Sequence, residues 1–328
     1  QHKVLSELRF DENNFFRVLE EIAISAWHSG DIRSTTVERI DKHIVENNLK
    51  SFFQEFQMGV QAGISRLLTA FYFRQKGIDI NQNKTFEFTH KSFGEYLASR
   101  RIINFLMLMS SKIDRHDNDP DEGINRKDAL KKIIETLGVT PIDGYLFQFL
   151  SNEIKLITKS KVERAQNNVI QLIEFSTKSG MPIELISPRP TFEEEQNYYR
   201  NSMLSLFIFL RVASDYTGIK SKINWESERT FGNVISNLRA LRISKSTVNF
   251  RKSDNDEINE TNSLLNSCFS NMIIENCHLT SLDLAYSNFS NSKFTNVIFA
   301  GADLFGADFT NSIFQNINFY RTSLNNCI

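Results

Sequence analysis

The residues able to do chemistry do not fall into any common catalytic spacing. The dipeptide Gly-Lys does not occur, so there is no GxxxxGK[ST] loop to hold a nucleotide phosphate, and HExxH, GxSxG and GxGxxG are absent too. The cysteines Cys268, Cys277 and Cys327 are odd in number and include no CxxC pair, which argues against a disulfide scaffold and a zinc ribbon. We therefore expect no catalytic residue, no metal site and no cofactor in this chain.

Length and composition indicate a globular protein of more than one domain. The 328 residues suit two or three domains, 41% are hydrophobic and 23% charged, and 38 Lys and Arg balance 39 Asp and Glu. The longest apolar stretches, Ile102–Met109 and Met203–Leu210, are far shorter than the roughly 20 residues of a spanning helix. We therefore expect no membrane insertion, and the cysteine usage fits a reducing cytoplasm.

Residues 200–252 are locally basic. They hold ten Lys or Arg against three Asp or Glu, a pattern that a nucleic-acid-binding face would also show. Acidic residues flank the segment on both sides, however, and we prefer intramolecular neutralisation to nucleic-acid binding. The flanking acids are Glu193, Glu194 and Glu195 on one side, and Asp254, Asp256, Glu257 and Glu260 on the other.

A change in composition near residue 260 predicts a domain boundary. All five prolines lie between Pro120 and Pro190, whereas the segment from Thr261 onward has no proline, two glycines and twelve asparagines. The acidic run at 254–260 is interpreted as a linker. The predicted domains are a winged-helix region at 1–112, a helical domain at 113–253 and a repeat domain at 261–328.

The C-terminal segment repeats every five residues. A Leu, Ile or Phe occupies thirteen consecutive positions at this spacing, most of them preceded by a small residue and followed by Asn or Gly at a distance of two. A period of five fits neither a helix nor a strand. It predicts a chain that turns a corner every five residues around an axis filled by the large side chains. The predicted axial residues are Leu264, Phe269, Ile274, Leu279, Leu284, Phe289, Phe294, Phe299, Leu304, Phe309, Phe314, Phe319 and Leu324.

This segment resembles the pentapeptide-repeat family, whose signature is A(D/N)LXX. Ala302-Asp303-Leu304-Phe305-Gly306 and the five residues after it match that signature closely. The resemblance implies a right-handed quadrilateral β-helix with four repeats per coil and a rise of about 4.8 Å between coils. Because so short a stack has few buried residues, we expect it to lean on the helical part at its N-terminal end.

The residues before the boundary indicate a mostly helical region, so the chain is expected to be an α+β multidomain protein. Apolar residues at helical spacing begin at Phe15, and Thr35-x-x-Glu38 and Ser92-x-x-Glu95 are read as capping boxes. The stretch Thr85–Thr89 alternates as a strand, and three helices followed by a β-hairpin predict a winged helix. Further helices are predicted at 127–137, 142–157, 161–178, 193–214 and 229–240.

The segment from Phe86 to Ala98, FEFTHKSFGEYLA, resembles the FxHxSFxEYLAA signature that follows the ATPase core in NACHT proteins of the STAND class. Ser99 stands where the family often has a second Ala. The resemblance implies a P-loop ATPase core, with ATP or ADP and Mg, N-terminal to Gln1, which is itself not a natural start. From its position at the end of a predicted strand, His90 is interpreted as a structural, hydrogen-bonded histidine. The resemblance implies instead that it senses the ADP β-phosphate. The matching motif residues are Phe88, Ser92, Phe93, Glu95 and Tyr96.

Three functions are compatible with these patterns. The favoured one is the regulatory and sensor portion of a bacterial NACHT-type STAND ATPase, a signalling or antiphage defence switch of innate immunity whose solenoid recognises a protein partner. An acidic pentapeptide rod that mimics DNA and shields a topoisomerase is the second, but residues 261–328 have a net charge of only −2 from Glu275, Asp283, Asp303, Asp308, Lys293 and Arg321. A scaffold without a switch is the third.

Overall fold

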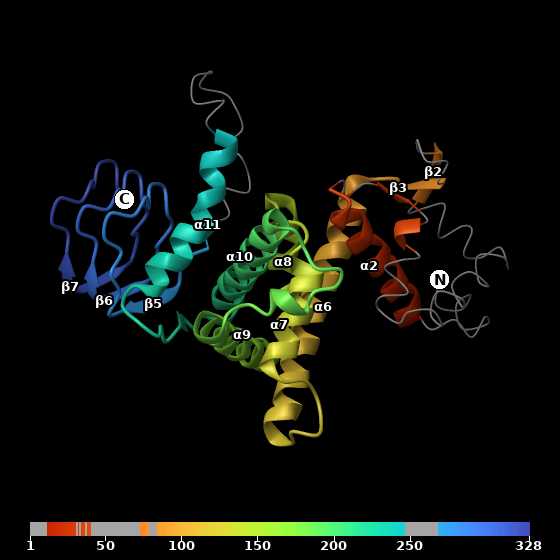
Figure 1. Cartoon of the computed structure of the whole chain (residues 1–328), viewed down its shortest axis with the longest axis horizontal. Coiled ribbons are helices and arrows are strands. Elements are labelled where there is room, and N and C mark those ends of the chain that lie inside the picture. The colour runs from red at the N-terminus through yellow and green to blue at the C-terminus, as the bar shows by residue number, and fades with distance from the viewer. Residues whose placement is uncertain are drawn as a thin grey trace. The chain divides into compact units, whose positions relative to one another are not determined.

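The computed structural model describes residues 12–30, 32, 34–36, 38–40, 73–78, 84–246 and 268–328 (Figure 1). The chain forms two compact units. One holds the residues up to Phe105 together with Gln148–Glu153, and the other holds Leu106–Phe147 and Ile154–Ile328. The second unit thus includes both helices and repeats. The predicted domain bounds stay predictions, and the predicted linker at 254–260 and Leu264 lie outside the described residues.

The first unit combines helices with a small antiparallel sheet. Its elements are α2 (Glu12–His28), β1 (Ser34–Thr36), β2 (Phe73–Ile78), β3 (Lys84–Phe88) and the first part of α6 (Lys91–Asn118). The sheet order is β1-β3-β2, and the predicted strand at 85–89 corresponds to β3. The apolar face of α2 is buried, including Leu19, Ile22 and Ala23. Most of the segment between β1 and β2, where the sequence predicts two helices, lies outside the described residues.

Two predicted capping boxes are wrong. Thr35 lies in β1 with its side chain buried, and the hydroxyl of Thr36 accepts the hydrogen bond from the Arg39 N–H at 3.3 Å. Ser92 does not precede α6, because that helix begins at Lys91 and Ser92 lies in its first turn. Several neighbouring residues can cap one helix start, so a capping pattern locates the start only to within a residue or two.

The helices predicted after residue 126 are confirmed. They are α7 (Arg126–Leu137), α8 (Gly144–Glu153) with a 3-10 turn η1 (Ile154–Leu156), α9 (Lys159–Ser179), α10 (Phe192–Thr217) and α11 (Thr230–Ser246); a second 3-10 turn, η2 (Ile183–Leu185), precedes α10. Thr191 and Glu194 form a capping box at the start of α10. Helix α10 packs against α7, α9 and α11, and residues 201–210 are all buried, so it is the central helix of this unit.

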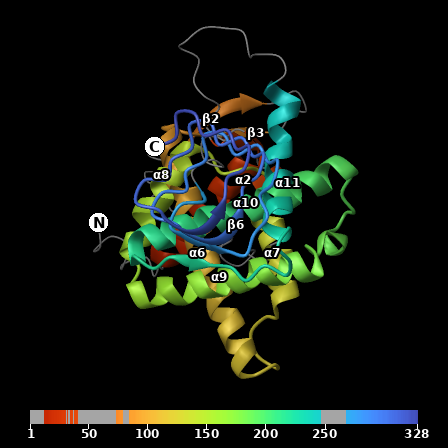
Figure 2. The same ribbon diagram turned by 90° about the vertical axis from the view of Figure 1, so that its left-hand side faces the viewer.

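The repeats form coils of twenty residues. Strands β5 (Met272–Glu275), β6 (Lys293–Ile298) and β7 (Ile313–Asn318) are parallel, and Ile273 pairs with Lys293, which pairs with Ile313. The isolated bridges elsewhere in the coils have the same spacing, such as Asp283 with Asp303. Four pentapeptides per coil are therefore confirmed. Figure 2 looks along the stack, so successive coils overlap in the view.

The corners of the coils explain the period of five. A residue with positive φ recurs at every fifth position from Asn271 to Asn326. Seven of these twelve residues are Asn and two are Gly, which adopt this left-handed conformation most readily, but Ser281, Tyr286 and Arg321 adopt it as well. For such residues the conformation costs about 1–2 kcal/mol, so the repeating backbone imposes it even where the side chain disfavours it.

The predicted axial residues fill the interior of the coils. From Phe269 to Leu304 all eight are fully buried, and their rings stack at the coil spacing, as for Phe294 on Phe314 and Phe299 on Phe319. In the last coil the burial fails. Phe309 and Phe319 are half-buried, whereas Phe314 and Leu324 are 41% and 45% exposed. Full axial burial therefore requires another layer of the protein on both sides of a coil.

The helices cover the N-terminal end of the stack, as expected. Strand β4 (Ser221–Lys222) pairs in parallel with β5 and extends the sheet to β4-β5-β6-β7. At the following corner the His278 N–H donates to the Glu228 carbonyl at 2.7 Å. Rings of α10 and α11, Phe207 and Phe231, meet the first axial ring, Phe269, at 5.7 and 5.9 Å. Segments of the helical region thus take the place of a preceding coil.

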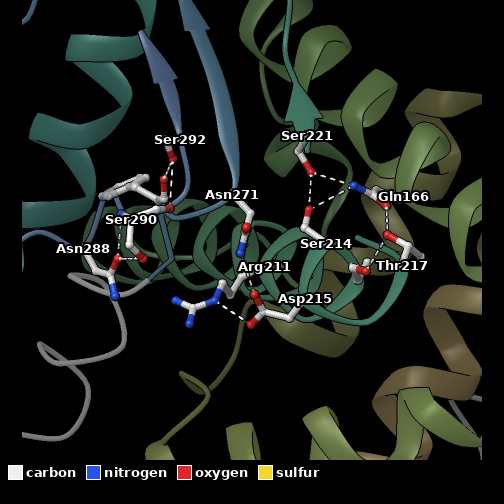
Figure 3. A network of polar contacts seen from close by, with 12 residues as sticks. Gln166, Arg211, Ser214, Asp215, Thr217, Ser221, Asn271, Asn288, Ser290 and Ser292 are labelled. Atoms are coloured by element: carbon white, nitrogen blue, oxygen red, sulfur yellow. Dashed lines mark hydrogen bonds and ion pairs between the residues drawn. The ribbon is translucent and has the colours of Figure 1, made fainter. Parts of the chain in front are cut away.

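Polar side chains fix this junction (Figure 3). The buried Gln166 amide of α9 donates to Ser214 of α10 at 3.0 Å and to Ser221 of β4 at 2.9 Å. Asp215 of α10 accepts from Asn271 at 2.6 Å. Arg239 of α11 donates to Asp283 at 3.1 Å and to the Ser287 hydroxyl at 2.6 Å. Contacts therefore reach several sides of the first coil.

We predict that axial and outward Phe residues differ sharply in their contribution to stability. Phe299→Ala removes a fully buried ring and is expected to lower the free energy of unfolding by about 3–5 kcal/mol. Phe305→Ala, one residue after an axial position, loses mainly its edge contact with Tyr286 and is expected to lower it by about 1 kcal/mol. Urea denaturation of both variants measures the difference, and equal losses would contradict the assigned register.

Candidate interaction surfaces

His90 lies at the corner between β3 and α6. Its side chain is exposed, and its ring meets the ring of Phe93 edge-on at 5.5 Å. Its carbonyl accepts the hydrogen bond from the Phe93 N–H at 3.1 Å, at the first turn of α6. The predicted position at a strand end and beside a helix start is therefore confirmed. The nucleotide-sensing role stays a prediction.

The other residues of the motif mostly hold this corner together. Phe88 is fully buried, and Glu95 is buried with a salt bridge to Lys91 at 3.1 Å. Tyr96 is half-buried and meets Phe149 edge-on at 6.1 Å. A Cβ at Gly94 would lie 2.5 Å from the Ile32 carbonyl oxygen, so this position requires glycine. These residues pack the corner, whereas His90 and Ser92 are exposed.

Three cations of the basic segment pair with acidic residues other than the predicted ones. Arg211 pairs with Asp215 at 2.7 Å, within α10. Lys222 pairs with Glu275 at 2.6 Å and Arg239 with Asp283 at 3.1 Å, so two of the partners belong to the repeats. Intramolecular neutralisation is thus seen for these three cations. The predicted partners between 254 and 260 lie outside the described residues.

The structure describes all three cysteines of the chain. None of Cys268, Cys277 and Cys327 forms a disulfide, and burial raises the pKa of both Cys268 and Cys277 to about 12, which keeps them protonated at neutral pH. Among the residues that the structure describes, no three His, Cys, Asp or Glu side chains are grouped to hold a metal ion. No helix in this part of the chain is long and apolar enough to cross a membrane.

An open hollow lies between the end of α6 and the start of α7. Its volume is about 630 Å³, and Arg126 and Asp117 are among the residues that line it. Two hydrogen bonds of 2.8 Å join these two side chains, so their charges neutralise each other. At this hollow, Arg126 and Asp117 therefore form a structural ion pair.

Corner residues that are twenty positions apart stack in four columns, one for each corner of the coil. Two of these four corner columns consist of asparagine alone. Asn316 donates to Asn296 at 2.8 Å, and Asn296 donates to Asn276 at 2.9 Å, each one coil apart. In the column that precedes the strands, Asn311 donates to Asn291 at 3.4 Å. Stacked amides of this kind satisfy one another along a column. Asparagine at these corners is therefore explained by the fold alone.

Comparison with known proteins agrees with this architecture. The family model "Pentapeptide repeats (8 copies)" matches residues 273–311 and 302–328. Residues 273–328 are pentapeptide repeats. No curated protein and no solved structure matches the chain. The matched repeats begin after Met272, so the winged-helix and NACHT resemblance of the upstream residues stays a prediction.

The sequence predicts the repeats but does not predict which residues join them to the helices. Strand β4 has only two residues, Ser221 and Lys222, and no local pattern marks it. Arg239 was counted only as one cation of a basic segment. The unusual corner at Tyr286 was visible in the sequence, because it departs from the Asn and Gly that occupy most positions of this type.

We predict that a second copy of the chain covers the exposed end of the pentapeptide solenoid. The axial Phe314 and Leu324 are 41% and 45% exposed there, whereas Phe294 and Leu304 one coil earlier are fully buried. For self-association, sedimentation velocity should show a mass that rises with concentration, and Phe314→Lys should keep the chain monomeric. A chain that stays monomeric at every concentration, with its 313–318 amides fully protected from hydrogen exchange, would contradict this prediction.

Proposed function

We propose that the chain is a non-catalytic regulatory module whose pentapeptide solenoid binds a protein partner. The observation that carries this proposal is the stack itself. Its N-terminal end is built onto α9–α11, while the outward side chain of Tyr286 remains 54% exposed. A rigid solenoid with exposed aromatic residues offers an interface for another protein. A DNA-mimicking rod is disfavoured, because two of its four acids are paired with Lys222 and Arg239.

The test of solenoid binding combines affinity purification with hydrogen exchange. The full chain serves as bait in a lysate of its host, and hydrogen exchange then compares the free chain with the purified complex. Recognition by the solenoid predicts added protection among residues 273–328. Protection confined to α6–α10, or no protein retained in stoichiometric amount, would contradict the proposal.

We further propose that this module belongs to a NACHT-type STAND ATPase, in which it senses nucleotide state and a trigger. Supporting this are the FTHKSFGEYL motif, the position of His90 between β3 and α6, and the β1-β3-β2 sheet that a winged helix would have. In such a parent the P-loop, Mg and nucleotide belong to another part of the protein. A Walker A motif upstream of Gln1 in the parent gene would support the proposal, and its absence would contradict it.

We predict that His90 contributes to the closed, ADP-bound state of that parent. Loss of one phosphate hydrogen bond should shift the closed-to-open equilibrium by about five- to 150-fold, so His90→Leu should raise basal activity. Ser92→Ala is the matched control, because Ser92 is also exposed and lies in the first turn of α6. ADP retention and basal activity are measured in stably folded, full-length variants. Unchanged values for His90→Leu would contradict the sensing role.

A further inference from the structure

Two corner columns of the pentapeptide solenoid depart from asparagine. One consists of Ser281, Gly301 and Arg321, and the other of Tyr286, Gly306 and Asn326. One all-asparagine column precedes β5–β7, the other lies directly after β5 and within β6 and β7, and both stabilise the coils through amide ladders. Residues that replace asparagine at a positive-φ corner give up this benefit. Corner positions without asparagine are therefore the places where a requirement other than folding has selected the residue.

Tyr286 is the most unusual of these corners. It has φ +60°, a conformation that bulky aromatic residues rarely adopt, and its side chain is still 54% exposed. A Cβ at Gly306, one coil further, would lie 2.9 Å from the Tyr286 ring, so glycine makes room for it. The ring of Phe305 meets the Tyr286 ring edge-on at 5.5 Å. The ring is thus held in place without being buried.

Carboxylates lie on both sides of this corner. Asp303 and Asp308 are one repeat apart, before and after Gly306, and each accepts a hydrogen bond from a backbone N–H, of Phe305 at 3.0 Å and of Thr310 at 2.8 Å. Neither forms an ion pair within the part of the chain that the structure describes. The coil that follows Tyr286 therefore carries two carboxylates without an ion-pair partner among the described residues, whereas Arg239, which bonds to Ala285 and Ser287 beside Tyr286, is paired with Asp283.

We propose that this surface, the Tyr286 corner (Tyr286, Asp303, Phe305, Gly306 and Asp308), is where the solenoid binds its partner. It takes a protein segment that presents an Arg or Lys side chain to the Tyr286 ring, with Asp303 and Asp308 as counter-charges. A cation over an aromatic face is attracted by the ring, and nearby carboxylates add to that attraction. The proposal rests on the proposed function of the solenoid as a protein-binding surface and names its site and the chemistry of its partner.

The test uses a random 12-residue peptide library displayed on phage, selected against the full chain. Two variants probe the corner. Tyr286→Asn removes the ring and gives the corner the residue most common at this position, and the double variant Asp303→Asn with Asp308→Asn keeps the amide oxygens that accept the backbone hydrogen bonds. Tyr320→Ser and Glu275→Gln are the matched controls, because they remove an exposed ring and a carboxylate elsewhere on the solenoid.

The selected peptides are expected to share an Arg or Lys. Their affinity should fall roughly 2- to 30-fold for each corner variant and change less than twofold for the controls, while Tyr286→Asn unfolds at no lower urea concentration than the wild type. If only the control variants weaken peptide binding, the Tyr286 corner is not the binding site, although the solenoid remains a binding surface. Acidic peptides, or binding that the corner variants leave intact, would overturn the Tyr286 corner as well. Failure to select any peptide for the solenoid would overturn both the corner and the proposed function.

Discussion

The structure depends on covering the first coil of the solenoid. The backbone N–H and C=O groups at the edge of an end coil need hydrogen-bond partners. In a stack of three coils the two end coils are most of the structure, so an uncovered end costs a large share of its stability. At the N-terminal end the helical region supplies those partners through β4, the Glu228 carbonyl and Arg239. At the other end no coil covers the axial Phe314 and Leu324, and their side chains remain partly exposed to solvent. The repeats and helices α9–α11 therefore behave as one structural unit.

Much of the solenoid could be predicted from the sequence, because each repeat meets the same environment. The period of five predicts the axial and corner residues, and the family resemblance implies the coil of twenty residues, which the register of β5–β7 bears out. The helices α7–α11 were predictable from their amphipathic spacing and their breakers. The burial of Phe314 was not, since it depends on how many coils follow rather than on the local pattern.

The junction and the surface of the solenoid could not be predicted in the same way. Arg239 reaches Asp283, 44 residues further along the chain, and no local spacing encodes such a pair. Strand β4 exists only because β5 offers it an edge. Tyr286 was recognisable as an exception among the corners, but only its exposure, together with the space left by Gly306, shows that its ring is presented to solvent. The role of the FTHKSFGEYL motif likewise stays a prediction.

Native-state hydrogen exchange in increasing urea tests the central claim most directly. If the helices serve as the first coil, the amides of β5 and those of α10 should open with the same free energy and the same urea dependence, as one cooperative unit. Arg239→Met should then lower both free energies equally. The account would be contradicted if the β5 amides exchanged through an opening of their own while α10 stayed protected. In that case the opening free energies of β5 and α10 would differ in their dependence on urea and in their response to Arg239→Met.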